Sequence, residues 1–155
     1  DAIPILEQIV AQNPKDADLR AHLGHVYAGQ QRWLSAARLF EEATDLGGQY
    51  AFEAADQYRM AARHRDALRL NGLVQSSQRQ LAQKVSILFE QEQYARIVAI
   101  KADFDDPAMG YRVAYAHYAV GDYSAAYTHA RALLKTRYRS EANALLKAIG
   151  HDRKP

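Results

Sequence analysis

An internal repeat constrains this chain more than any other feature of its sequence. Aromatic or histidine residues recur at spacings of 31, 30 and 29, at Trp33, His64, Tyr94 and Tyr123. A second track, of mostly small residues, keeps the same steps at Gly24, Ala55, Val85 and Ala114, and its partner track runs through Ala36, Ala67, Ile97 and Ala126. Because independent tracks share one shortening register, the sequence predicts similar structural units that stack on one another.

The periodicity within each repeat predicts helices. Apolar residues recur three and four positions apart, and the chain has only four prolines, which is typical of amphipathic helices. Helices are expected near residues 2–12, 17–29, 33–46, 49–62, 65–73, 78–91, 94–101, 107–120, 123–136 and 140–149. We expect Pro14, Gly47–Gly48 and Gly150 to end helices and Asp106–Pro107 to begin one.

The clearest repeat is the segment LRAHLGHVYAGQQRWLSAARLFEEA, residues 19–43. Its characteristic residues are Leu23, Gly24 and Tyr27 in one helix and Trp33, Ala36, Phe40 and Ala43 in the next. This pattern resembles the tetratricopeptide repeat (TPR) family, in which small residues lie where two antiparallel helices cross. Val85 and Ile97 depart from the family pattern of small residues, so the third repeat is degenerate.

The resemblance implies an all-α fold, a TPR-like α-solenoid, in which antiparallel helix pairs form a right-handed superhelix with a C-terminal capping helix. It implies one domain over residues 1–155, with a half repeat at 1–14, repeats at about 17–47, 48–75, 78–104 and 107–137, and a capping helix at about 140–149. Since the chain opens in mid-repeat, we expect it to be a piece of a longer protein.

Signatures of catalysis and of metal binding are missing from the sequence. Cysteine is absent, which excludes thiolate chemistry and fits either a reducing compartment or a disulfide-free periplasmic domain. His22 and His25 lack a recognisable third ligand, and the acidic residues at 103–106 lack the remaining ligands of an EF-hand. Phosphate loops, nucleophile elbows and HExxH motifs are also missing. We expect no enzyme activity, no cofactor and no metal.

The charge balance and hydropathy exclude two further partners. A formal net charge of +2 is too small to indicate nucleic acid, and the basic residues at 131–155 are scattered rather than aligned in a stripe. No apolar run approaches the roughly 18 to 20 residues that cross a bilayer. We therefore expect neither nucleic-acid binding nor direct membrane insertion.

A tyrosine stripe is the most suggestive feature for function. Tyr111, Tyr115 and Tyr118 are spaced i, i+4 and i+7, so they share one helix face. The resemblance implies that first helices line a concave groove. By the same register, further groove candidates are Arg112, Phe52, Asp56, Arg59, Phe89, Ser86 and His25. The alternative is that the tyrosines pack on a neighbouring repeat.

These features predict a non-catalytic scaffold that binds a protein or peptide in its groove. We expect it to belong to a larger bacterial protein of the cell envelope or of a secretion system, and favour the periplasm over the cytoplasm. The alternative is a carbohydrate-binding domain that guides an exopolysaccharide during export, with the tyrosines as stacking platforms. Homo-association is a further expectation, through the apolar side of the first helix around Ile5, Leu6 and Ile9.

Overall fold

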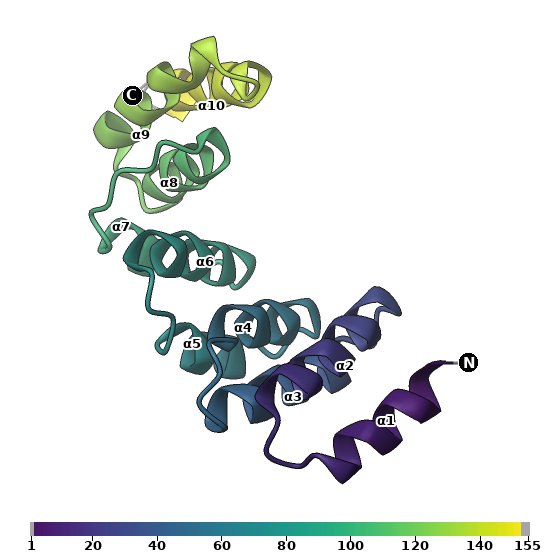
Figure 1. Ribbon diagram of the computed structural model, residues 1–155. Coiled ribbons are helices and arrows are strands. Elements are labelled where there is room, and N and C mark those ends of the chain that lie inside the picture. The colour runs from purple at the N-terminus through teal and green to yellow at the C-terminus, as the bar shows by residue number, and fades with distance from the viewer. Residues whose placement is uncertain (1, 153–155) are drawn as a thin grey trace. The chain divides into compact units, whose positions relative to one another are not determined.

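The computed structural model describes residues 2–152, and these residues form α-helices and no strand (Figure 1). The helices are α1 (Ala2–Gln12), α2 (Ala17–Gly29), α3 (Trp33–Asp45), α4 (Ala51–Met60), α5 (His64–Asn71), α6 (Ser77–Glu90), α7 (Tyr94–Val98), α8 (Pro107–Ala119), α9 (Tyr123–Ala132), a 3-10 helix η1 (Leu133–Lys135) and α10 (Arg139–Asp152). The all-α prediction is confirmed. The chain divides into two compact units between Gln80 and Leu81, inside α6.

In the first unit, helices α1 to α5 each pack against the next. Phe40 on α3 is fully buried, and a Cβ built on Gly24 of α2 would lie 3.2 Å from its ring. The glycine therefore leaves the space that the ring fills. At the end of this unit, Asn71 Nδ2 donates to the Gln80 carbonyl at 2.9 Å and Gln80 Nε2 donates to the Asn71 carbonyl at 3.0 Å. This reciprocal pair attaches α5 to the start of α6.

The second unit has a core of its own among α8, α9 and α10. Its buried residues are mostly small or branched: Ala114, Ala126, Ala130, Leu133, Ala142, Leu145 and Ile149. Helix α10 packs against both α8 and α9 and covers their apolar side. Asp106 begins α8, because its side chain accepts a hydrogen bond from the Ala108 amide at 3.2 Å and Pro107 follows at the first helical position.

One turn recurs four times along the chain. It follows α2, α4, α6 and α8, and the second residue after each helix has a positive φ: 59° at Gln31, 57° at Ala62, 55° at Glu92 and 82° at Gly121. The following amide donates to the carbonyl five residues earlier, as in Arg32 to Tyr27 at 2.9 Å, which is the Schellman motif. The turns keep the spacings of 31, 30 and 29 that the sequence shows, and the eight residues of the small tracks are all buried. The repeat is therefore also a repeat of backbone geometry.

Several helix ends differ from the expected ones. Helix α10 continues through Gly150, whose φ is not positive and whose missing side chain faces open space. Helix α7 ends at Val98 rather than at 101, and Lys101 has a left-handed φ of 50°. Residues 101–105 then make no backbone hydrogen bond within the described part of the chain. Helix α9 ends at Ala132 and tightens into η1.

Candidate functional site

The predicted tyrosine stripe lies on α8 in the second unit. The ring centroids of Tyr111 and Tyr115 are 6.3 Å apart, and those of Tyr115 and Tyr118 are 6.1 Å apart. All three side chains are half-buried and pack against the core of this unit. The rings thus contact residues of neighbouring helices, and the groove stays a prediction.

Four more aromatic residues extend the stripe. Phe89 and Tyr94 meet Tyr115 edge to face at 5.7 and 5.5 Å. Tyr138 stacks on Tyr111 at 5.7 Å and 20°. Tyr123 contacts Tyr118 at 5.8 Å. We name this connected set the tyrosine surface: Phe89, Tyr94, Tyr111, Tyr115, Tyr118, Tyr123 and Tyr138, all half-buried.

Five hydroxyl groups of the tyrosine surface are unused by the protein. They belong to Tyr94, Tyr111, Tyr115, Tyr123 and Tyr138, and none makes a hydrogen bond to another described residue. Burial raises the pKa of Tyr111, with Tyr115 as the next cause, and burial likewise raises the pKa of Tyr94. The hydroxyls of Tyr94 and Tyr111 are therefore held in the neutral form, and a neutral tyrosine hydroxyl can both donate and accept a hydrogen bond.

Arg112 lies beside the tyrosine surface and is bonded to neutral groups. Its Nη1 donates to Ser86 Oγ and lies 3.8 Å from Met109 Sδ. Its guanidinium is 5.8 Å from the Phe89 ring centroid. Ser86 in turn donates to the Ala82 carbonyl at 3.0 Å, so its oxygen is oriented to accept from the arginine. The six predicted residues of this unit thus form one connected network.

The predicted residues of the first unit contact partners both on their own helix and on other helices. His25 meets the Phe40 ring at 4.8 Å, edge to face. Arg59 pairs with Asp56 one helical turn away at 2.8 Å. The guanidinium of Arg79 lies 3.9 Å from the Phe52 ring centroid.

Tyrosines of the first unit donate their hydroxyls to carboxylates on other helices. Tyr27 donates to Glu7, Tyr58 to Glu41, and Tyr50 to Asp18 at 2.6 Å. The bond to the carboxylate is the main cause that raises the pKa of Tyr27 and of Tyr50, and burial is the main cause for Tyr58.

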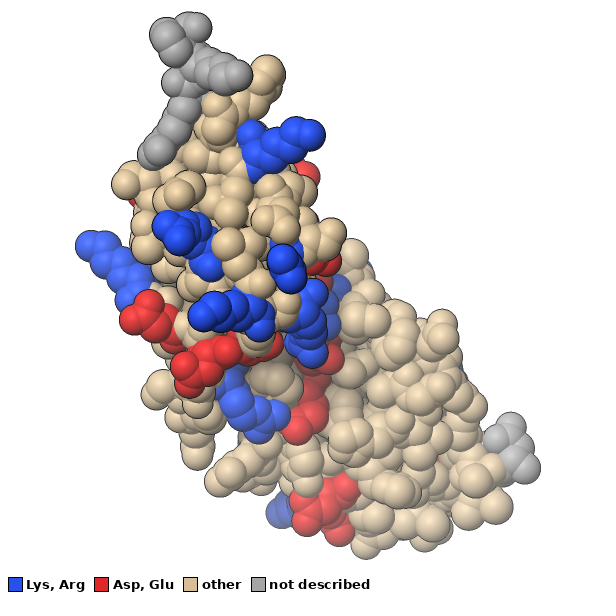
Figure 2. Space-filling model, turned by 90° about the horizontal axis from the view of Figure 1, so that it is seen from above, with Lys and Arg blue, Asp and Glu red and all other residues tan. Residues whose placement is uncertain are grey.

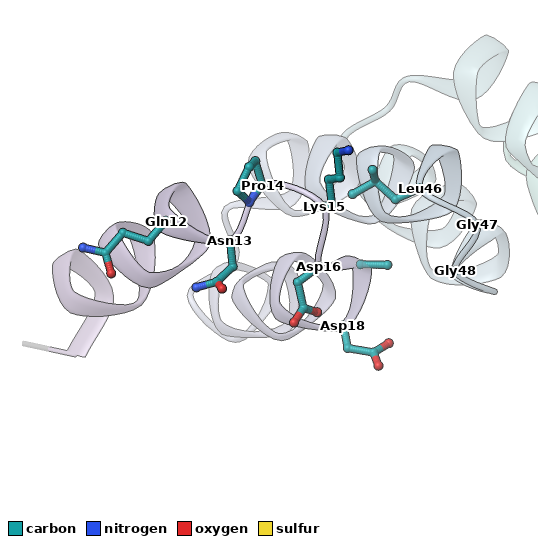
Figure 3. A pocket seen from close by; sticks show the side chains of 10 residues that line it. Gln12, Asn13, Pro14, Lys15, Asp16, Asp18, Leu46, Gly47 and Gly48 are labelled. Carbon is teal, nitrogen blue, oxygen red and sulfur yellow. The ribbon is translucent and has the colours of Figure 1, made fainter.

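The hollow shown in Figure 3 has a volume of about 780 Å³ and lies between residues 12–18 and 46–48. None of the predicted site residues lines it. Asp16 caps α2 by accepting from the Leu19 amide at 3.0 Å, and Asp18 accepts from the hydroxyl of Tyr50. Because the carboxylates of the hollow already serve the fold, we assign it no function.

A smaller hollow of about 380 Å³ in the second unit contains a histidine pair. The rings of His117 and His129 stack at 5.1 Å, and His117 Nδ1 lies 3.0 Å from Asp122 Oδ2. Burial lowers the pKa of His129. The bond from the Ala125 amide, and then that from His117, lowers the pKa of Asp122. Since Asp122 also caps α9 through Ala125, this arrangement has a structural explanation.

Two features of the described chain bear on metal binding and on membrane insertion. Within residues 2–152, no group of three or more His, Asp or Glu residues is arranged to hold a metal ion. No helix of the described chain is long and apolar enough to cross a membrane. On α1, Ile5 and Ile9 are 63% and 39% exposed while Leu6 is half-buried, and homo-association stays a prediction.

Sequence reasoning missed three members of the tyrosine surface. Tyr94 and Tyr123 belong to the repeating aromatic track, which could have placed them next to the first helices. Tyr138 lies outside every repeat, in the segment between η1 and α10, and no sequence signal relates it to Tyr111. No protein-family model and no curated protein matches this sequence.

Proposed function

We propose that this chain is a non-catalytic binding scaffold, built as a TPR-like α-solenoid, that holds a protein partner on the tyrosine surface. The unused hydroxyls of five half-buried tyrosines are the observation that carries the proposal. A tyrosine combines a large apolar ring with a hydroxyl that can donate and accept a hydrogen bond, and tyrosine is enriched at protein interfaces for this reason. A polypeptide supplies such partners along its backbone.

The solenoid part of the proposal is supported by the recurring Schellman turn and by the buried small residues. Both keep the spacing of the sequence repeat. A stack of helix pairs offers extended surfaces that suit extended partners. In this proposal the scaffold works within a larger bacterial protein of the cell envelope or of a secretion system.

An exopolysaccharide is the second candidate partner, because tyrosine rings and hydroxyls suit sugars as well. Arg112 favours the protein partner over a neutral polysaccharide, since a neutral sugar offers no charge to pair with its guanidinium. Capture of a partner by the immobilised chain separates the two. We expect Tyr115→Ala to reduce affinity for a captured and then purified protein by about tenfold or more, as truncation of a central interface tyrosine does.

Tyr127→Ala is the matched control, because Tyr127 is 42% exposed on α9 and lies outside the tyrosine surface. Thermal unfolding of each variant reports whether the fold survives. Equal affinities of Tyr115→Ala and Tyr127→Ala for the partner would rule out the tyrosine surface as the binding site. Saturable binding of a neutral polysaccharide, without protein capture, would replace the scaffold with the polymer-guiding domain.

A further inference from the structure

Arg112 is a half-buried cation whose positive charge has no counterpart in the protein. Its neighbours are the Ser86 hydroxyl, the Met109 sulfur and the Phe89 ring. No carboxylate of the described side chains lies within ion-pair distance of it. Partial burial makes a charge more costly unless it is paired. Binding of an anion to the guanidinium would therefore stabilise this charge.

The guanidinium is also held in place. Ser86 uses its proton on the Ala82 carbonyl, at 3.0 Å, and so presents an oxygen lone pair to Arg112. The serine fixes one nitrogen of the guanidinium and leaves further N–H donors for a ligand. A positioned guanidinium loses little conformational freedom when it binds the two oxygens of a carboxylate.

Rings continue outward from Arg112 and end at a second cation. Phe89 is followed by Tyr115, Tyr111 and Tyr138 in a series of contacts between 5.7 and 6.3 Å. Arg137 lies 5.6 Å from the centroid of the Tyr138 ring. Its ion pair with Asp106, at 3.6 Å between exposed groups, is weak.

Basic residues outnumber acidic ones in the sequence from residue 131 to 147, where Glu141 is the acidic residue and lies near Tyr111. Lys and Arg side chains gather on the face that Figure 2 shows, beside fewer acidic ones. The exposed cations between residues 131 and 147 are Arg131, Lys135, Arg137, Arg139 and Lys147. A partner with several carboxylates would pair with more than one of these groups.

We propose that the tyrosine surface binds an acidic segment of a protein, with an Asp or Glu carboxylate of that segment bonded to Arg112 and its apolar residues seated on the rings of Phe89 and Tyr115. This inference rests on the proposed function and specifies its partner. It favours side-chain carboxylates over a chain terminus, because cations lie at both ends of the series of rings.

Two labelled peptides test the inference, one in which Glu alternates with Leu and a twin in which Gln replaces Glu. Both carry blocked termini, and binding is measured by fluorescence anisotropy at low and high salt. We expect the Glu peptide to bind about tenfold more tightly, as a bond to a charged group provides. The preference should shrink at high salt and disappear in Arg112→Gln.

Arg38→Gln is the matched control, because it removes the same charge from an exposed position in the first unit. Equal affinities of the two peptides, both lost in Tyr115→Ala, would overturn the acidic partner and leave the scaffold standing. Failure of both peptides to bind, or binding of a polysaccharide in their place, would overturn both proposals. If Arg112→Gln does not fold, the preference of the wild-type chain for Glu over Gln decides by itself.

Discussion

Tyrosines of the first unit contribute their hydroxyls to the fold, whereas those of the second unit contribute their rings. Tyr27, Tyr50 and Tyr58 each donate to a carboxylate on another helix. Tyr111 and Tyr115 contact other rings and leave their hydroxyls unused. The same residue type therefore holds helices together in one region and leaves hydrogen-bonding capacity for a ligand in the other, and only the partners of the hydroxyl distinguish the two roles.

The largest expected effect tests the helix crossing on which the first unit depends. Gly24→Leu should lower the free energy of unfolding by about 1 to 3 kcal/mol through overpacking, because even a Cβ would lie 3.2 Å from the Phe40 ring. Thermal and urea unfolding measure the loss. Gly29→Leu is the control on the same helix, since no atom lies within 4 Å of its added Cβ, and equal losses would show that the register is wrong.

Removal of single hydroxyls tests the comparison directly. Tyr58→Phe should cost about 1 kcal/mol, because it removes a bond to a charged carboxylate. Tyr115→Phe should leave the free energy of unfolding unchanged, since its hydroxyl bonds to no described residue. Glu41 keeps its ion pair with Arg69 at 2.8 Å, which limits the first loss. Similar losses in the two variants would abolish the distinction between the units.

High pH should weaken the first unit through the same bonds. Burial and Glu41 raise the pKa of Tyr58 above its usual value of 10.0, so the unfolded chain loses this proton first. The resulting stabilisation is complete below about pH 10 and is lost as the pH rises through the folded-state pKa. Urea unfolding between pH 8 and about 11.5 should show a smaller alkaline loss in Tyr58→Phe than in the wild type. If the free energy of unfolding fell equally with pH in the two proteins, ionisation of Tyr58 would not be the cause of the alkaline loss.

The smallest effect concerns the turn that both units share. Ala62→Gly in the first unit and Glu92→Gly in the second should each stabilise the fold by about 0.5 kcal/mol, because glycine adopts a positive φ without strain. The gain should be similar in both units, unlike the effects at the tyrosines. Gly121→Ala should reverse the sign, since φ is 82° there. Differential scanning calorimetry measures all three changes. A loss of stability in Ala62→Gly would show that the positive φ of Ala62 does not strain the backbone.

The helices and their close crossings could be predicted from the sequence because local patterns determine them. Ala36 and Ala126 are fully buried, as their place in the repeat requires. The members of the tyrosine surface were harder to predict, because Tyr138 meets Tyr111 from outside the repeat and the bond between Arg112 and Ser86 joins α8 to α6. Such contacts depend on how elements pack, and a single sequence carries no pattern for them.

Helix boundaries were least predictable where the backbone changes conformation for reasons of packing. Helix α7 ends at Val98 and Lys101 adopts a left-handed φ, although the sequence there contains no glycine that would indicate a helix end. Conversely, Gly150 leaves α10 intact. Glycine permits a left-handed residue but does not require one.

The unbonded stretch after α7 makes this chain most vulnerable to proteases inside the second unit. Residues 101–105 have no backbone bond to break before they enter an enzyme's cleft, and Lys101 is an exposed cleavage point for trypsin. Cleavage there would leave Phe89 and Tyr94 on one fragment and the tyrosines of α8 on the other. A partner seated across these rings would hold the two fragments together, so resistance to trypsin should report occupancy of the tyrosine surface.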